Sequence, residues 1–131
     1  MGLVASEGRP VRLRGIRGAT TVERNTREAI LDATDELLRL LIEANAIEAD
    51  DVASALFFTT PDLNAEFPAV VAREHHGWTH VALQCAHDMA VPGSLPMCVR
   101  VLLHVNTDRT QAEVRHIYAR GARVLRPDLT S

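Results

Sequence analysis

The chain has 131 residues, of which 47% are apolar and 24% are charged, as in an ordinary globular domain. Its net charge of −3 disfavours a nucleic-acid surface, because such domains are usually clearly basic, and no apolar run approaches the ~20 residues of a membrane span. Cys85 and Cys98 are isolated and no signal-like stretch opens the chain, so a cytoplasmic protein with free thiols is expected. We expect residues 1–11 to form a flexible leader and residues 12–131 a single domain with a mobile C-terminal tail.

The first predicted strand carries an unusual arginine. Apolar and polar residues alternate from Val11 to Arg14, which is typical of a half-buried strand. Gly15 and Gly18 then bracket Arg17, and glycine in a strand often marks the close approach of a ligand or of another backbone. A guanidinium held there keeps its charge and offers a planar fork of donors, which suits a small dianionic ligand. A surface arginine on an edge strand is the simpler interpretation.

The next segment predicts a long amphipathic helix. Asn25 to Glu28 resembles a capping box, with Glu28 placed to reach back to the Asn25 amide. Asn45 is a plausible helix end. The apolar positions between them recur at the spacing of one buried helical face; they are Ile30, Leu31, Thr34, Leu37, Leu38, Leu41 and Ile42.

The middle of the chain predicts a strand. A helical turn over residues 48–52 leads into the run 55–60, which is nearly all apolar and β-prone. Such a run is typical of a strand buried on both faces. Residues 61–64 break it.

A second helix and a third strand are expected next. The helix begins near Phe67-Pro68, since proline is tolerated in a first turn, and ends at Gly77, a good left-handed cap. The strand covers residues 79–85, and the turn-rich residues 88–94 form its exit loop.

The fourth predicted strand, residues 97–105, contains an anomaly. One face is apolar throughout, but the other places Arg100 between Cys98 and Leu102. An arginine between two core-like side chains must be paired with an opposite charge or solvated. Arg100 is therefore a candidate functional residue.

The C-terminal part predicts one more helix and one more strand. Thr110 to Glu113 has the pattern of a capping box, opening a helix that runs through Tyr118. A final strand is expected over residues 122–125, and a proline-containing tail follows at 126–129. The whole order predicts an α+β (α/β-like) layer fold. One sheet with few helices on one side leaves an apolar surface, so an oligomer is expected.

The residues do not form a familiar catalytic set. No nucleophile elbow and no phosphate-binding glycine loop is present. A metal interpretation of the histidines is weak, because no pair has i,i+4 spacing within one predicted helix; these are His75, His76, His80 and His87, with Asp88 nearby. A thiol–base pair of Cys85 and His87 lacks a third orienting group. The remaining candidates are arginines, a tyrosine and a carboxylate. Such a set binds anions and stabilises charge but does not need to move protons. A reaction that needs only this would be a rearrangement within one molecule.

Several short motifs resemble those of the trimeric, mixed-sheet chorismate mutases of the AroH type. Together they extend over about residues 12–129, almost the whole chain, in the family's order and without gaps. They are Arg14–Arg24, Thr60–Leu63, Phe67–Ala69, Arg73-Glu74, Gly77-Trp78, Cys98–Arg100, Arg115–Tyr118 and Val124–Leu129.

The resemblance implies a fold and an activity. The fold is a single mixed sheet with helices on one face, and three copies form a barrel-like core with active sites in the subunit clefts. The activity is conversion of chorismate to prephenate in aromatic amino-acid biosynthesis. This is a [3,3] Claisen-type rearrangement without cofactor, metal or covalent intermediate.

The resemblance also implies the catalytic residues. Arg17 would pair with a substrate carboxylate and Tyr118 would hydrogen-bond one. Arg100 would donate to the ether oxygen, where negative charge grows as the C–O bond breaks, and would also contact a carboxylate. Asp88 would contact the substrate hydroxyl, a position where the family usually has glutamate. Val70 stands where the family often has lysine, which removes one positive charge at the pocket mouth.

The remaining substrate-binding residues are implied in the same way. Phe67, Ala69 and Arg73 would come from the neighbouring subunit, and Cys85 would approach the ring hydroxyl. Leu125 and Arg126 would form part of a mobile lid, and Leu83 and Gln84 complete the set.

Two other functions fit the same architecture. One is a trimeric deaminase of small imines or enamines, which also uses an arginine in an interface cleft. The other is a trimer that binds an anionic metabolite without turning it over. Fold alone does not separate them from a mutase.

Overall fold

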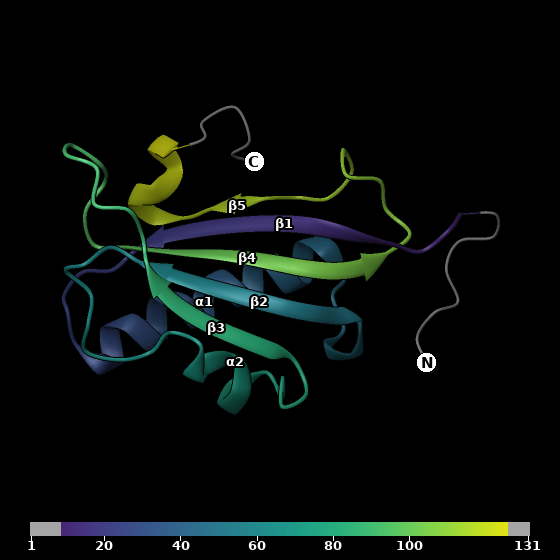
Figure 1. The fold of residues 1–131 in the computed structure, drawn as a ribbon, viewed down its shortest axis with the longest axis horizontal. Helices are drawn as coiled ribbons and strands as arrows, with labels where there is room; N and C mark the ends of the chain where they lie inside the picture. Colours follow the sequence, from purple (N-terminus) through teal and green to yellow (C-terminus); the bar gives the residue numbers. More distant parts are fainter. Residues whose placement is uncertain (1–8, 126–131) are drawn as a thin grey trace.

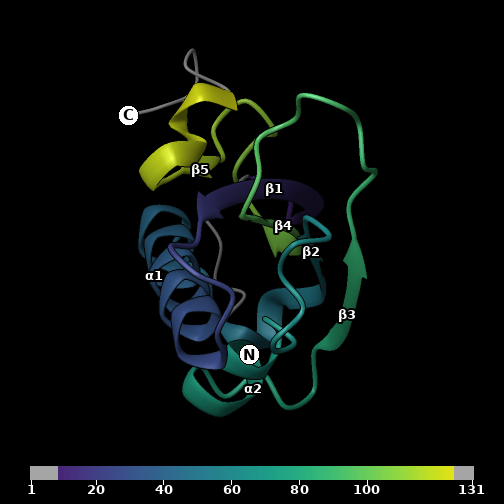
Figure 2. The same cartoon turned by 90° about the vertical axis from the view of Figure 1, so that its left-hand side faces the viewer.

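The computed structural model describes residues 9–125 and shows one five-stranded sheet with its two α-helices on one face (Figures 1 and 2). The strand order is β3-β2-β4-β1-β5. β4 is antiparallel to β1 and β2, whereas β2–β3 and β1–β5 are parallel pairs. The predicted single sheet with helices on one face is therefore confirmed, and it is mixed. The elements are β1 (Arg12–Thr21), α1 (Arg27–Asn45), the 3₁₀ turn η1 (Ala49–Asp51), β2 (Val52–Thr59), α2 (Val70–His75), β3 (Ala82–His87), β4 (Cys98–Thr107), β5 (Ile117–Tyr118) and the 3₁₀ turn η2 (Arg120–Leu125).

The core lies between the sheet and α1. Alternation along β4 sends four residues into it, as predicted: Val99, Val101, Leu103 and Val105 are all at most 2% exposed. Gly18 on β1 lies directly under α1, because a Cβ there would come within 2.9 Å of Leu41 Cδ1. The close approach signalled by this glycine is therefore that of a helix, not of a ligand.

The opposite face of the sheet carries no α-helix within residues 9–125. Leu56 and Phe58 of β2 point to it and are only partly buried, whereas Phe57 on the helix side is fully buried. In a single chain β2 is thus buried on one face, and the prediction of burial on both faces is not met. The open face therefore keeps partly exposed apolar side chains in the single chain.

The cap of α1 differs from the prediction by one residue. Thr26 is the N-cap, and its hydroxyl accepts from the Ala29 N–H at 3.1 Å. The Asn25 side chain instead accepts from the backbone N–H groups of residues 64 and 65. The helix does end at Asn45, followed by Ala46 in the left-handed conformation.

The prediction of a C-terminal helix from the capping box was wrong. Thr110 and Glu113 make both reciprocal hydrogen bonds of a capping box, but only a turn follows. The Asn45 side chain holds the backbone N–H and C=O of Arg115, which draws the chain into an extended path. Residues 117–118 then pair with β1 as β5.

The strand expected over residues 122–125 was also wrong, because these residues belong to η2. The turn starts at Arg120, whose φ is 52°, and the Gly121 N–H donates to Thr21 Oγ1.

β3 also begins three residues later than predicted. The tail from residue 126 and most of the leader lie outside the described residues. No helix within residues 9–125 is long and apolar enough to cross a membrane.

Candidate active site

One row of residues crosses the open face of the sheet. Register aligns Phe58 of β2 with Arg100 of β4, Arg100 with Ala19 of β1, and Ala19 with Tyr118 of β5. Arg100 and Tyr118 are therefore two strand spacings apart, about 9–10 Å along the row. Only the methyl group of Ala19 stands between them. Arg17 lies on the same face, one alternation away along β1.

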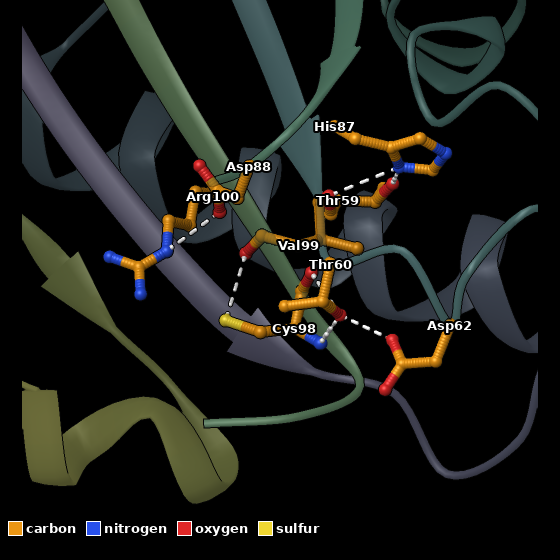
Figure 3. A network of polar contacts seen from close by, with 8 residues as sticks. All are labelled: Thr59, Thr60, Asp62, His87, Asp88, Cys98, Val99 and Arg100. Atoms are coloured by element: carbon orange, nitrogen blue, oxygen red, sulfur yellow. Dashed lines mark hydrogen bonds and ion pairs between the residues drawn. The ribbon is translucent and has the colours of Figure 1, made fainter. Parts of the chain in front are cut away.

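Arg100 is paired with Asp88, as its apolar surroundings predicted. The Arg100 Nε and Asp88 Oδ2 atoms are 3.0 Å apart, and the two side chains are 39% and 25% exposed (Figure 3). Both atoms are buried, and their alignment falls short of a hydrogen bond, so each has no hydrogen-bond partner among the described residues. A buried donor left in this state is costly. An acceptor on a bound ligand would satisfy it.

Tyr118 and Arg17 are held by different means. Tyr118 is 7% exposed and packs with Ala19, Cys98 and Ala122, and Leu125 covers this small cluster. Arg17 has an exposed side chain, and its backbone N–H donates to His116 Nδ1 at 2.9 Å. The fixed backbone leaves the Arg17 guanidinium free to meet an anion.

A second set of predicted residues lines a cavity on the other side of the sheet. Cys85 pairs with Phe57 and Leu83 with Ala55, so both side chains belong to the helix-side face of β3. The cavity has a volume of ≈ 250 Å³ and lies between α2 and β3. It is lined by Phe67, Ala69, Val70, Arg73, Leu83, Gln84 and Cys85. An adjoining cavity of ≈ 340 Å³ shares Phe67 and Cys85.

The two sets do not meet within one chain. Arg17, Asp88, Arg100 and Tyr118 occupy the open face, here called the cationic face, with Leu125 beside Tyr118. The seven residues of the second set form what is here called the α2 cavity. Leu83 and Cys85 lie on the other face of the sheet, whereas Gln84 pairs with Leu56 and lies on the open face of the edge strand β3. Arg126 lies outside the described residues.

The cysteines are poor nucleophiles in this structure. Burial raises the pKa of the Cys85 thiol, against the opposing effects of a backbone hydrogen bond from Ala69 and of the Arg73 charge. Burial likewise raises the pKa of Cys98 to about 11. His87 is hydrogen-bonded through Nδ1 to Thr59 Oγ1 at 3.0 Å. A thiol–base pair of Cys85 and His87 has no support here.

The buried Cys98 thiol predicts a stability change at alkaline pH. Its pKa rises from 9.0 when unfolded to about 11 when folded, so the folded state holds the proton more tightly. This contribution is complete below pH 9 and is lost as the pH rises through 11. The free energy of unfolding should fall by about 2–3 kcal/mol more in the wild type than in Cys98→Ala over that range. Denaturant unfolding at pH 8, 9, 10 and 11 measures it, and parallel curves for the two proteins would contradict it.

The histidines considered as metal ligands are dispersed. His76 contacts the Asp35 carboxylate at 2.8 Å and His75 lies 3.8 Å from the same oxygen. This contact links α2 to α1. Within residues 9–125, no group of three or more His, Cys, Asp or Glu side chains is arranged to hold a metal.

Comparison with known proteins decides the family. The chain matches the family model described as Chorismate mutase type I over residues 13–129. The chain belongs to the chorismate mutase type I family. The resemblance drawn from the sequence motifs is thereby confirmed.

Relatives in the chorismate mutase type I family are similar over nearly their whole length. Chorismate mutase AroH of Bacillus subtilis (strain 168) is 49% identical over 118 residues, which cover 90% of this chain and 93% of that protein. Chorismate mutase AroH of Thermus thermophilus is 51% identical over 120 residues, covering 91% and 98%. A solved structure, the chorismate mutase from Clostridium thermocellum, matches with a TM-score of 0.82 and 48% identity, covering 84% of this chain and 97% of that one.

Two features of the site in this chorismate mutase type I chain were missed from sequence. Ala19 leaves room between Arg100 and Tyr118, and Phe58 is the neighbour of Arg100 on the adjoining strand β2. Alternation along β1 places residues 17 and 19 on one face, so Ala19 could have been found. The position of Phe58 depends on strand order, which the sequence pattern does not contain.

Proposed function

We propose that this chain converts chorismate to prephenate by a cofactor-free [3,3] rearrangement. One observation carries the proposal: among the described residues the buried Arg100 Nε lies 3.0 Å from Asp88 Oδ2 without completing a hydrogen bond, on a face that also presents Arg17 and Tyr118. Such a face suits a dicarboxylate. The rearrangement moves no proton, because one C–O bond breaks while one C–C bond forms within the same molecule. It therefore needs a clamp and a charge, not a nucleophile or a base.

The cationic face would supply both the groups that hold the substrate and the positive charge at the breaking bond. Arg17 and the Tyr118 hydroxyl would hold carboxylates, which keeps a flexible molecule in its compact reactive geometry. Arg100 would donate to the ether oxygen, where charge is greater in the transition state than in the ground state. An interaction that strengthens during the reaction is the kind that raises turnover.

We also propose a homotrimer with active sites between subunits. The cationic face and the α2 cavity lie on opposite sides of one sheet, and the partly buried Leu56 and Phe58 leave the open face in need of a cover. A contact between two different surfaces of identical chains generates a ring when the rotation closes. The family resemblance supplies the number three. We further propose a cytoplasmic location, because Cys85 and Cys98 are free thiols, as is usual in a reducing compartment.

Purified protein mixed with chorismate tests the function. Loss of chorismate absorbance with matching formation of prephenate is expected, together with a trimer mass by light scattering. Turnover of a small imine but not of chorismate would favour a deaminase. Chorismate binding without turnover would favour a metabolite-binding trimer.

Removing the Asp88 carboxylate should be damaging. Asp88 is the ion-pair partner of Arg100 within residues 9–125, and it is the group proposed to meet the substrate hydroxyl. Asp88→Ala should lower kcat/KM for chorismate by about tenfold or more, the usual size for a lost charged hydrogen bond. Asp88→Glu, which restores the longer side chain usual in the family, should keep wild-type activity or exceed it. Full activity in Asp88→Ala would show that the hydroxyl contact lies elsewhere.

A further inference from the structure

A polar network at the start of β4 fixes the backbone two residues before Arg100 (Figure 3). The Cys98 N–H donates to Thr60 Oγ1 at 3.0 Å, and the Thr60 N–H donates to the Cys98 carbonyl at 3.0 Å. The Thr60 hydroxyl in turn donates to Asp62 Oδ1. Thr60 is 7% exposed, so this chain of hydrogen bonds is largely shielded from water.

Asp62 also holds the residue before Cys98. Its other oxygen, Oδ2, accepts from the Met97 N–H at 3.0 Å. Met97 has a φ of 52°, a left-handed conformation that is unfavourable for a residue with a side chain. The Met97 carbonyl accepts from the Val22 N–H at 2.8 Å. One carboxylate thus stabilises a strained turn through two oxygens, each with its own donor.

The same short segment also anchors Asp88. The Asp88 N–H donates to the Thr59 carbonyl at 2.8 Å. The Arg100 strand and Asp88 are therefore both attached to residues 59–62, and residues 89–96 run between the two attachment points. A cavity of ≈ 270 Å³ lies under that loop, with Asp62 in its lining. The loop is not densely packed there, so hydrogen bonds are needed to hold its ends.

We propose that Asp62 is a positioning residue for Arg100. It touches no substrate atom in this scheme. By fixing Met97 and, through Thr60, Cys98, it sets the direction in which the Arg100 side chain leaves β4. Displacing a catalytic group by a fraction of a bond length to one ångström can cost up to about a hundredfold in rate. This inference rests on the proposed chorismate mutase activity.

Asp62→Asn is the most informative variant, because an amide has nearly the shape of a carboxylate. It offers one acceptor, for the Met97 N–H, and one NH₂ donor, which would face Thr60 Oγ1. The Thr60 hydroxyl would then have to turn its hydrogen to the Cys98 carbonyl, 3.5 Å away, and its charge-assisted hydrogen bond to a carboxylate would be lost. We expect kcat for chorismate to fall by about tenfold, and KM to change by less than about twofold, because Arg100 acts mainly in the transition state. Asp32→Asn, an exposed carboxylate on α1, is the matched control and should resemble the wild type.

A double-mutant cycle separates positioning from general support of the fold. In an Arg100→Lys background the flexible ammonium depends less on the direction in which the side chain leaves β4. Asp62→Asn should therefore lower kcat in that background by less than about twofold. An equal loss in both backgrounds would overturn the inference, as would wild-type kcat in both Asp62→Asn and Asp62→Ala. A wild-type protein that does not turn over chorismate would instead refute the proposed function.

Discussion

Arg100→Ala is expected to lower the turnover of chorismate by about a hundredfold to a thousandfold while the protein stays folded. In the proposed mechanism Arg100 is the donor to the breaking C–O bond, whereas Tyr118, the other donor in the same row of the sheet, is assigned to a substrate carboxylate. The loss corresponds to about 3–4 kcal/mol of transition-state stabilisation. Steady-state assays of chorismate loss measure it, with circular dichroism and light scattering as checks on fold and assembly.

Two further variants identify what Arg100 contributes. Arg100→Lys keeps a positive charge but replaces a rigid fork of donors by a flexible point charge, so its turnover should also be poor. Arg39→Ala removes an exposed arginine that pairs with Asp35 on α1 and should leave turnover unchanged. Near-normal turnover in Arg100→Ala would refute the assignment.

Arg100 itself could be predicted because local pattern and burial agree there. Alternation along residues 97–105 identified both faces of β4, and an arginine between Cys98 and Leu102 required a partner. The structure supplies that partner in Asp88. Predictions of this kind depend only on neighbours in the chain.

The errors arose where distant residues decide the local structure. Residues 110–113 have a valid capping box, yet the Asn45 side chain, about seventy positions away, binds Arg115 and prevents a helix. The cap of α1 moved to Thr26 because Asn25 is occupied with residues 64–65. Local signals cannot weigh these long-range hydrogen bonds against helix formation.

The division of the proposed site residues into two sets also could not be read from spacing. Residues 67–85 and residues 17–118 overlap along the chain, and only the pairing register shows that Leu83 and Cys85 lie on the face of the sheet opposite to Arg17 and Arg100. The family resemblance implied that Phe67, Ala69 and Arg73 come from a neighbour. The structure groups Leu83 and Cys85 with them, in the same cavity.

Mixed trimers should recover activity that neither parent has. Arg73→Glu places a carboxylate in the α2 cavity, where it repels a dianionic substrate, and Arg73 is exposed, so the fold should tolerate the change. Homotrimers of Arg73→Glu and of Arg100→Ala should each be roughly a hundredfold or more below wild type. If each site combines the cationic face of one subunit with the α2 cavity of the next, equal co-expression should yield about one native site in four.

The fraction follows from random assembly of a closed ring. About three quarters of the trimers contain both kinds of subunit, and each of these has one interface where an intact cationic face meets an intact α2 cavity. Recovery to about a quarter of wild-type activity thus distinguishes shared sites from sites built within one chain, for which mixing restores nothing. The matched control pairs Arg100→Ala with Arg17→Ala. Both changes lie on the cationic face, so every site in that mixture keeps a defect and activity should remain at the level of the parents.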